Sequence, residues 1–61
     1  MNQFSINQIV AGRVAGQFVI LGTRYVGGVF GYQVKEVNPA NHTEVARGES
    51  FYTPDMLRAL N

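Results

Sequence analysis

The sequence predicts an all-β domain in which four to five short strands curl into a small barrel that ends in a helical turn. Three observations lead to this prediction. Short segments rich in β-branched and aromatic residues recur along the chain, glycines separate them, and a helix-start pattern occurs once, near the end. A chain of 61 residues is expected to form one domain, residues 1–61.

The first two strand segments run from Gln8 to Val14 and from Gln17 to Val26. Gly12 predicts a bulge or a bend in the first segment, because glycine contributes no side chain to a strand interior. The centre of the second segment is apolar at successive positions, which is typical of a strand that is covered on both sides or bends, here at Gly22. The seven residues before these segments include two large apolar side chains, so we expect them to pair as an edge strand.

A chain reversal is predicted at Gly27-Gly28, because both positions of a primed two-residue turn need positive φ angles, which glycine adopts without strain. The segment that follows, Val29 to Asn38, alternates in polarity. One of its faces carries Phe30, Tyr32 and Val34, and we assign that face to the core.

The last strand signal spans Thr43 to Tyr52, after a polar loop at residues 38–42, and we expect Gly48 to divide it into two short strands. A helical start follows. Thr53 is placed as the N-cap, Pro54 occupies the first helical position and Asp55 lies in the first turn. One or two turns would align three apolar side chains along one edge: Met56, Leu57 and Leu60.

Composition narrows the classes of function. Five basic and four acidic residues give a net charge of +1, which is a weak basis for phosphate-driven nucleic-acid binding and favours self-association. The absence of cysteine excludes disulfides and thiolate metal sites, and no metal or cofactor is expected. The first ten residues lack the pattern of a signal peptide and no apolar run is long enough to span a membrane, so a cytoplasmic location is predicted.

The strand count, the hairpin "GGVFGYQV" and the terminal "FYTPDMLRAL" together resemble SH3-like barrels. Small phage and bacterial proteins of unassigned function are similar to this pattern over most of the chain's length. The resemblance implies a stand-alone module that acts by binding, of a kind that would suit an accessory protein of a phage or mobile element.

The last eleven residues, "FYTPDMLRALN", are also similar to the C-terminal segment of the plasmid-borne, trimethoprim-resistant dihydrofolate reductases. Those enzymes are SH3-like barrels that assemble as tetramers around one central active-site pore. Their pore motif reads Gln-Ile-Tyr where this chain has Ser50-Phe51-Tyr52, so only Tyr52 carries over. The missing groups are the ones expected to touch folate and cofactor, and an oligomeric pore enzyme is therefore the remote alternative.

The residue types and their spacing give little support for a catalytic function. His42 is the one histidine of the chain, the residue type most often used as a general base, and Glu44 lies two positions on. The pair reads either as a general base with its orienting carboxylate or as an exposed turn histidine, and the turn is the favoured interpretation. The glycine cluster at residues 27–31 lacks the lysine and the following helix of a phosphate-binding loop. No catalytic residue is predicted.

The aromatic hairpin leaves two interpretations open. Its rings either supply the core of a small domain or form a surface that stacks on a partner, as aromatic residues near hairpin tips do in related barrels. Tyr25 is out of step with the apolar face of its strand and is expected to be exposed. The candidate partner-binding residues are Arg24, Tyr25, Phe30, Tyr32, Lys35 and Arg47.

A second candidate surface lies at the C-terminal end. Phe51, Met56 and Leu57 either close one end of the barrel or form an apolar oligomer surface. The function predicted from the sequence is a non-catalytic binding module that mediates protein–protein contacts or self-association. The alternative is nucleic-acid binding through an aromatic and basic barrel face that carries Arg24, Tyr25, Tyr32, Lys35 and Arg47.

Overall fold

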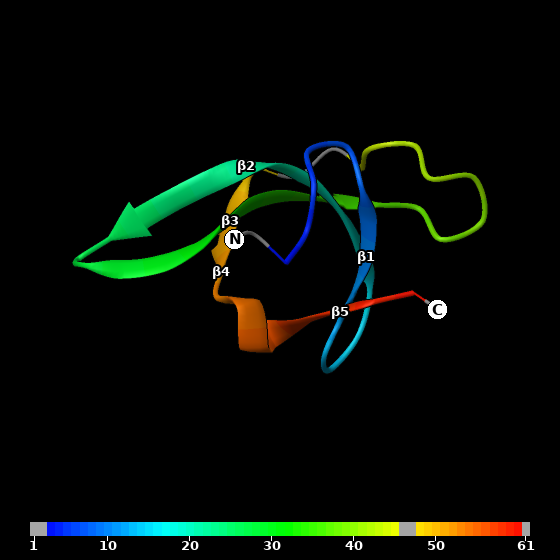
Figure 1. Ribbon diagram of the computed structural model, residues 1–61. Coiled ribbons are helices and arrows are strands. Elements are labelled where there is room, and N and C mark those ends of the chain that lie inside the picture. Colours follow the sequence, from blue (N-terminus) through cyan, green and yellow to red (C-terminus); the bar gives the residue numbers. More distant parts are fainter. Residues whose placement is uncertain (1–2, 46–47, 61) are drawn as a thin grey trace.

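The computed structural model describes residues 3–45 and 48–60, which form one five-stranded antiparallel sheet and a single 3₁₀ turn (Figure 1). The protein is therefore all-β, as predicted. The elements are β1 (Ile9–Gly12), β2 (Gln17–Val26), β3 (Val29–Val37), β4 (Ser50–Tyr52), the 3₁₀ turn η1 (Pro54–Met56) and β5 (Leu57–Ala59).

The strands lie in the order β4-β3-β2-β1-β5, with η1 between the last two strands of the chain. This is the arrangement of a small SH3-like barrel, in which the sheet coils around one core. The sheet does not close, because β4 and β5 form its two edges. No helix in the described part of the chain is both long enough and apolar enough to cross a membrane.

The longest pairing is the hairpin of β2 and β3, which turns at Gly27-Gly28 as predicted. Val26 pairs with Val29, and the two glycines have φ angles of 57° and 82°. The register shifts once, between Ile20 and Gly22, which places the predicted bend in β2. Beyond this bulge the hairpin extends as a free arm from the body of the molecule (Figure 1).

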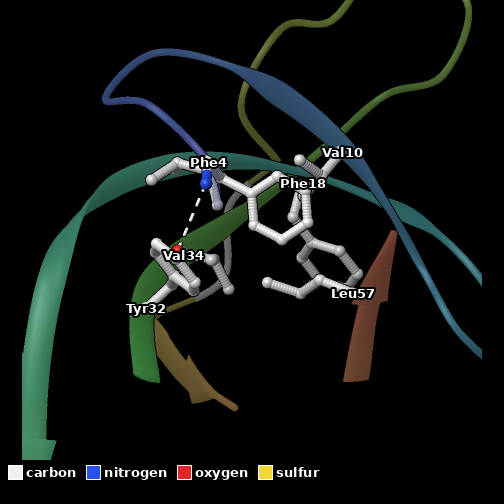
Figure 2. Packing of buried hydrophobic residues seen from close by; sticks show 7 residues of the cluster. Phe4, Val10, Phe18, Tyr32, Val34 and Leu57 are labelled. Carbon is white, nitrogen blue, oxygen red and sulfur yellow. Dashed lines mark hydrogen bonds between the residues drawn. The ribbon is translucent and has the colours of Figure 1, made fainter. Parts of the chain in front are cut away.

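The core lies beneath the coiled sheet and is closed by the N-terminal segment. Its cluster contains Phe4, Val10, Phe18, Ile20, Tyr32, Val34 and Leu57. Figure 2 shows how the Phe4 and Tyr32 rings meet inside it, with ring centroids 5.3 Å apart. Tyr32 is 0% exposed, so the assignment of the Tyr32 and Val34 face to the core is confirmed, with Phe30 half-buried at its margin.

The expectation of an edge strand in the first seven residues is wrong for residues 3–7, and residues 1–2 lie outside the described part of the chain. Residues 3–7 follow bends and a turn, and the backbone amides of Gln3 and Phe4 donate to the Tyr32 hydroxyl at 2.9 and 3.2 Å. Asn7 has a φ of 72° and donates its amide to the Ile20 carbonyl. The path of this segment is therefore determined by burial of the Phe4 ring and by hydrogen bonds to the Tyr32 hydroxyl, and not by strand pairing.

β1 is shorter than predicted because it ends at Gly12. The Gly12 amide donates to the Gly16 carbonyl and closes a tight turn. A side chain at Gly12 would meet the Ala15 carbonyl oxygen and the Phe18 ring, so glycine is required for close approach and not for a bulge inside the strand. Val14, predicted as the last strand residue, is 99% exposed in this turn.

The C-terminal helical turn is confirmed, but it ends sooner than its sequence pattern suggests. Leu57–Ala59 is strand β5, which pairs with β1, so the predicted helical edge of Met56, Leu57 and Leu60 does not form. Leu57 enters the core, whereas the other two side chains are exposed. Strand pairing satisfies the backbone here and outweighs the local helical preference.

The sequence predicts two short strands, one on either side of Gly48. The second of them is β4, which begins at Ser50. Before Gly48, the described residues 38–45 carry only an isolated bridge between Glu44 and Val37, and residues 46–47 lie outside the described part of the chain. The β3 strand ends at Val37, one residue earlier than expected.

Candidate partner-binding surfaces

The arm carries an aromatic ladder that starts in the core and ends in solvent. From Tyr32 it continues to Phe30, at a centroid distance of 5.4 Å, and from Phe30 to Tyr25 across the hairpin, again at 5.4 Å. Each pair is edge-to-face, the arrangement that ring quadrupoles favour. Tyr25 is 70% exposed, so its predicted exposure is confirmed and the ladder ends in an uncovered ring.

Two valines complete the exposed end of the hairpin. Val26 and Val29 pair beside the turn, on the face of the hairpin opposite Tyr25 and Phe30, and are 45% and 51% exposed. Space around the turn is open, since side chains added at Gly27 or Gly28 would meet no atom within 4 Å. We call the four residues Tyr25, Val26, Val29 and Phe30 the apolar arm. Apolar side chains gathered at an exposed tip are typical of an interaction surface.

The predicted aromatic–basic surface is not assembled, because strand alternation separates its members. Arg24 precedes Tyr25 and therefore points to the opposite face. There its Nη1 donates to Gln33 Oε1 at 3.2 Å, and Gln33 Nε2 donates to Glu49 Oε1 at 3.1 Å. Lys35 lies on the same face of β3 as Gln33, and its Nζ is 3.1 Å from Glu44 Oε1.

Tyr32, a further member of that surface, does not contribute to it either. Tyr32 is buried, and its hydroxyl is occupied by the backbone of the N-terminal segment. Arg47 lies outside the described residues. Of the five candidates that the structure describes, Tyr25 and Phe30 share one face of the hairpin, Arg24 and Lys35 share the opposite face, and Tyr32 is buried.

A pocket of about 440 Å³ forms a second candidate surface, between the turn after β1 and η1. Phe18 and Tyr52 line it together, with ring centroids 5.1 Å apart and planes at 87°. Its remaining lining residues are Gly12, Arg13, Val14, Asp55 and Met56. No local pattern predicts this pocket, because the pairing of β1 with β5 brings together Arg13 and Asp55, which lie 42 positions apart in the sequence.

The rim of the pocket carries one cation and one anion. Arg13 Nη1 donates to the Asp55 carbonyl oxygen at 2.9 Å, and the Arg13 amide donates to the Met56 carbonyl at 2.9 Å. The pKa of Asp55 is lowered, chiefly because the Thr53 hydroxyl donates to its carboxylate, and further by the backbone amide of Asp55 and the charge of Arg13. Asp55 is therefore a carboxylate at neutral pH, beside an apolar cavity.

The predicted oligomer surface of Phe51, Met56 and Leu57 is dispersed. Leu57 is buried in the core, which corrects its assignment to a surface. The Phe51 ring is half-buried and occupies the space that a side chain at Gly31 would need. Only Met56 is exposed, and it lines the pocket.

The histidine lies in an exposed turn, where His42 has a φ of 59° and donates its amide to the Asn38 carbonyl. The Glu44 carboxylate, which was the candidate orienting group, contacts Lys35. Within residues 3–45 and 48–60, no three His, Cys, Asp or Glu side chains gather as a metal site would require. Tyr52, the one residue carried over from the reductase resemblance, is half-buried in the wall of the pocket.

No family model, no curated protein and no solved structure matches this chain.

Proposed function

We propose that this chain is a non-catalytic binding module whose partner is a protein surface, and that a second copy of the chain is the first partner to expect. One observation supports this above all: the apolar arm extends beyond the core and ends in exposed aromatic and β-branched side chains. A module of this size would suit an accessory protein of a phage or mobile element.

The physical case rests on what burial of the arm would contribute. Each large apolar side chain that leaves water stabilises a complex by roughly 1.5–3 kcal/mol. Tyrosine is also enriched among the residues that dominate binding energies, since it offers a large area at low entropic cost. A chain of 61 residues buries little surface by itself, so association would stabilise it further.

The charges support a protein partner over a nucleic acid. Arg24 and Lys35 are engaged with Gln33 and Glu44 on the face opposite Tyr25. A strand of nucleic acid stacked on the arm would therefore meet few cations to neutralise its phosphates.

Light scattering across a dilution series tests the proposal, with the apolar arm intact and with Tyr25→Ser. We expect the native chain to associate at high concentration and the variant to remain monomeric. Retention on a DNA resin that falls steeply with salt would favour the nucleic-acid alternative instead. Oxidation of NADPH with dihydrofolate, insensitive to trimethoprim, would favour the reductase alternative.

A further inference from the structure

Building on the proposed function, we propose that two copies associate by reciprocal exchange, in which the apolar arm of each copy inserts into the pocket of the other. The fold leaves two apolar features exposed at separate places, namely the apolar arm and the pocket.

The exposed apolar side chains concentrate in these two features. Among the described residues, seven large hydrophobic side chains are exposed. Three of them, Tyr25, Val26 and Val29, belong to the arm, and Val14 and Met56 line the pocket. The other two are Ile6 and Leu60. Burying arm and pocket against each other would thus remove most of this apolar surface from water.

The arm cannot fill the pocket of its own chain. Phe18, in the pocket, stands near the start of β2, and Val26, in the arm, ends the same strand. Eight residues of extended chain separate them by up to roughly 26 Å. Pairing with β3 keeps the arm extended, and Figure 1 shows it projecting away from the turn that joins β1 to β2. The contact must therefore be between copies.

The two surfaces complement each other in shape and polarity. The tip is slim because its turn consists of two glycines, and the pocket is an open cleft whose volume of about 440 Å³ lies within the range of clefts that bind small ligands. The floor of Phe18 and Tyr52 offers ring edges and faces to Tyr25. The Tyr25 hydroxyl needs a polar partner when buried, and Asp55 and Arg13 stand at the rim.

Interface area favours a reciprocal contact over a single insertion. Specific interfaces bury at least about 1,200 Å² in total, which is a large share for a chain whose whole surface is 4136 Å². One slender tip is a small part of that surface, and two insertions double the buried area. Reciprocity also closes the assembly as a symmetric dimer, whereas one-way insertion would extend into a chain of subunits.

Cross-linking between single-cysteine variants tests the exchange directly, since the native chain has no cysteine. Val29→Cys marks the arm and Val14→Cys marks the pocket. The two variants are mixed under mild oxidation with one of them labelled with ¹⁵N, so that intact mass identifies mixed dimers. We expect the mixed disulfide between arm and pocket to exceed both homodimers.

Ile6→Cys is the matched control, because Ile6 is 66% exposed and belongs to neither feature. Excess Val29→Cys homodimer would show arm-to-arm pairing, which overturns the exchange but leaves self-association intact. Cross-linking no greater than with the Ile6 control would also overturn it. The dilution series then shows separately whether the chain self-associates at all.

Complementation gives a second test. Val26→Thr/Val29→Thr weakens the arm, Met56→Glu weakens the pocket, and Ile6→Thr is the control. Each weakened variant alone should raise the dimer dissociation constant roughly 30-fold or more, as expected for hot-spot side chains. Mixing the two should restore dimers, because one native arm then meets one native pocket. Equal weakness of the mixture and of each variant alone would contradict the exchange.

Discussion

The two halves of the β2–β3 hairpin share one sequence pattern and differ in what covers them. In the body, Tyr32 and Val34 are fully buried beneath the N-terminal segment and β5. In the arm, the same face of β3 continues to Phe30, and the ladder ends at Tyr25 in solvent. Alternation thus decides which face is apolar, whereas burial depends on whether another segment lies over that face.

Truncating the residue that covers the body should have the largest effect. Phe4→Ala removes a buried ring that packs on Tyr32 and should lower the free energy of unfolding by about 3–5 kcal/mol, enough to unfold a marginal domain. Tyr25→Ala, at the exposed end of the ladder, should change it by less than about 0.5 kcal/mol. Urea denaturation followed by circular dichroism measures both. Equal losses would show that the arm is as well covered as the body.

Two glycines of the hairpin should change the free energy of unfolding in opposite directions when replaced by alanine, because one is crowded and the other has open space. A side chain at Gly31 would collide with the Phe51 ring and the Tyr52 carbonyl oxygen, so Gly31→Ala should destabilise by about 1–3 kcal/mol. Gly22 has open space and an ordinary φ, and Gly22→Ala should stabilise by about 0.4–1 kcal/mol through the unfolded state. Thermal melts of the two variants provide the measurement. A stabilised Gly31→Ala chain would contradict the close packing of β4 on β3.

The Tyr32 hydroxyl in the body should make a smaller contribution to the free energy of unfolding, which can be measured separately from that of the ring. Tyr32→Phe keeps the ring but leaves the Gln3 and Phe4 amides without their acceptor, which should cost about 1–2 kcal/mol. Hydrogen exchange of these two amides should accelerate more than exchange of amides in the β2–β3 ladder. Unchanged protection would mean that the hydroxyl does not hold the segment.

The smallest effect is expected in the pocket rim, from Asp55. Its folded pKa lies below the ordinary value of 3.8, so the folded state is favoured by the carboxylate above pH 3.8 and loses this contribution as pH falls through the lower folded value. Asp55→Asn should remove this part of the acid dependence, as should Thr53→Ala to a large extent. Urea midpoints measured over acidic pH for the three chains give the comparison. An unchanged slope in both variants would remove Asp55 from the acid response.

Local patterns predicted much of the sheet because their causes are local. Gly27-Gly28 supplies the two positive φ angles of the turn, and alternation in β3 identifies the core face. Patterns failed where a distant segment competes for the same residues. The residues around Leu57 predict a helix, but Leu57 belongs to a strand that pairs with β1. The residues around Phe4 predict a strand, but the Phe4 ring is buried in the core.

The residues of the candidate site could be predicted only where local patterns determine their positions. The exposure of Tyr25 follows from its position relative to the apolar residues of its own strand. The loss of the aromatic–basic face also follows from alternation, once Arg24 and Tyr25 are placed on one regular strand. No local signal joins Phe18 to Tyr52, so the pocket could not be predicted.

Residue order alone determined that this chain is all-β and where its longest hairpin turns. These properties depend on backbone freedom, side-chain periodicity and composition, which neighbouring residues define. Folding in three dimensions decided which faces are covered, because coverage depends on segments far apart in the chain. It buried Tyr32 beneath the N-terminal segment, left Tyr25 in water and joined the turn after β1 to η1 around a pocket.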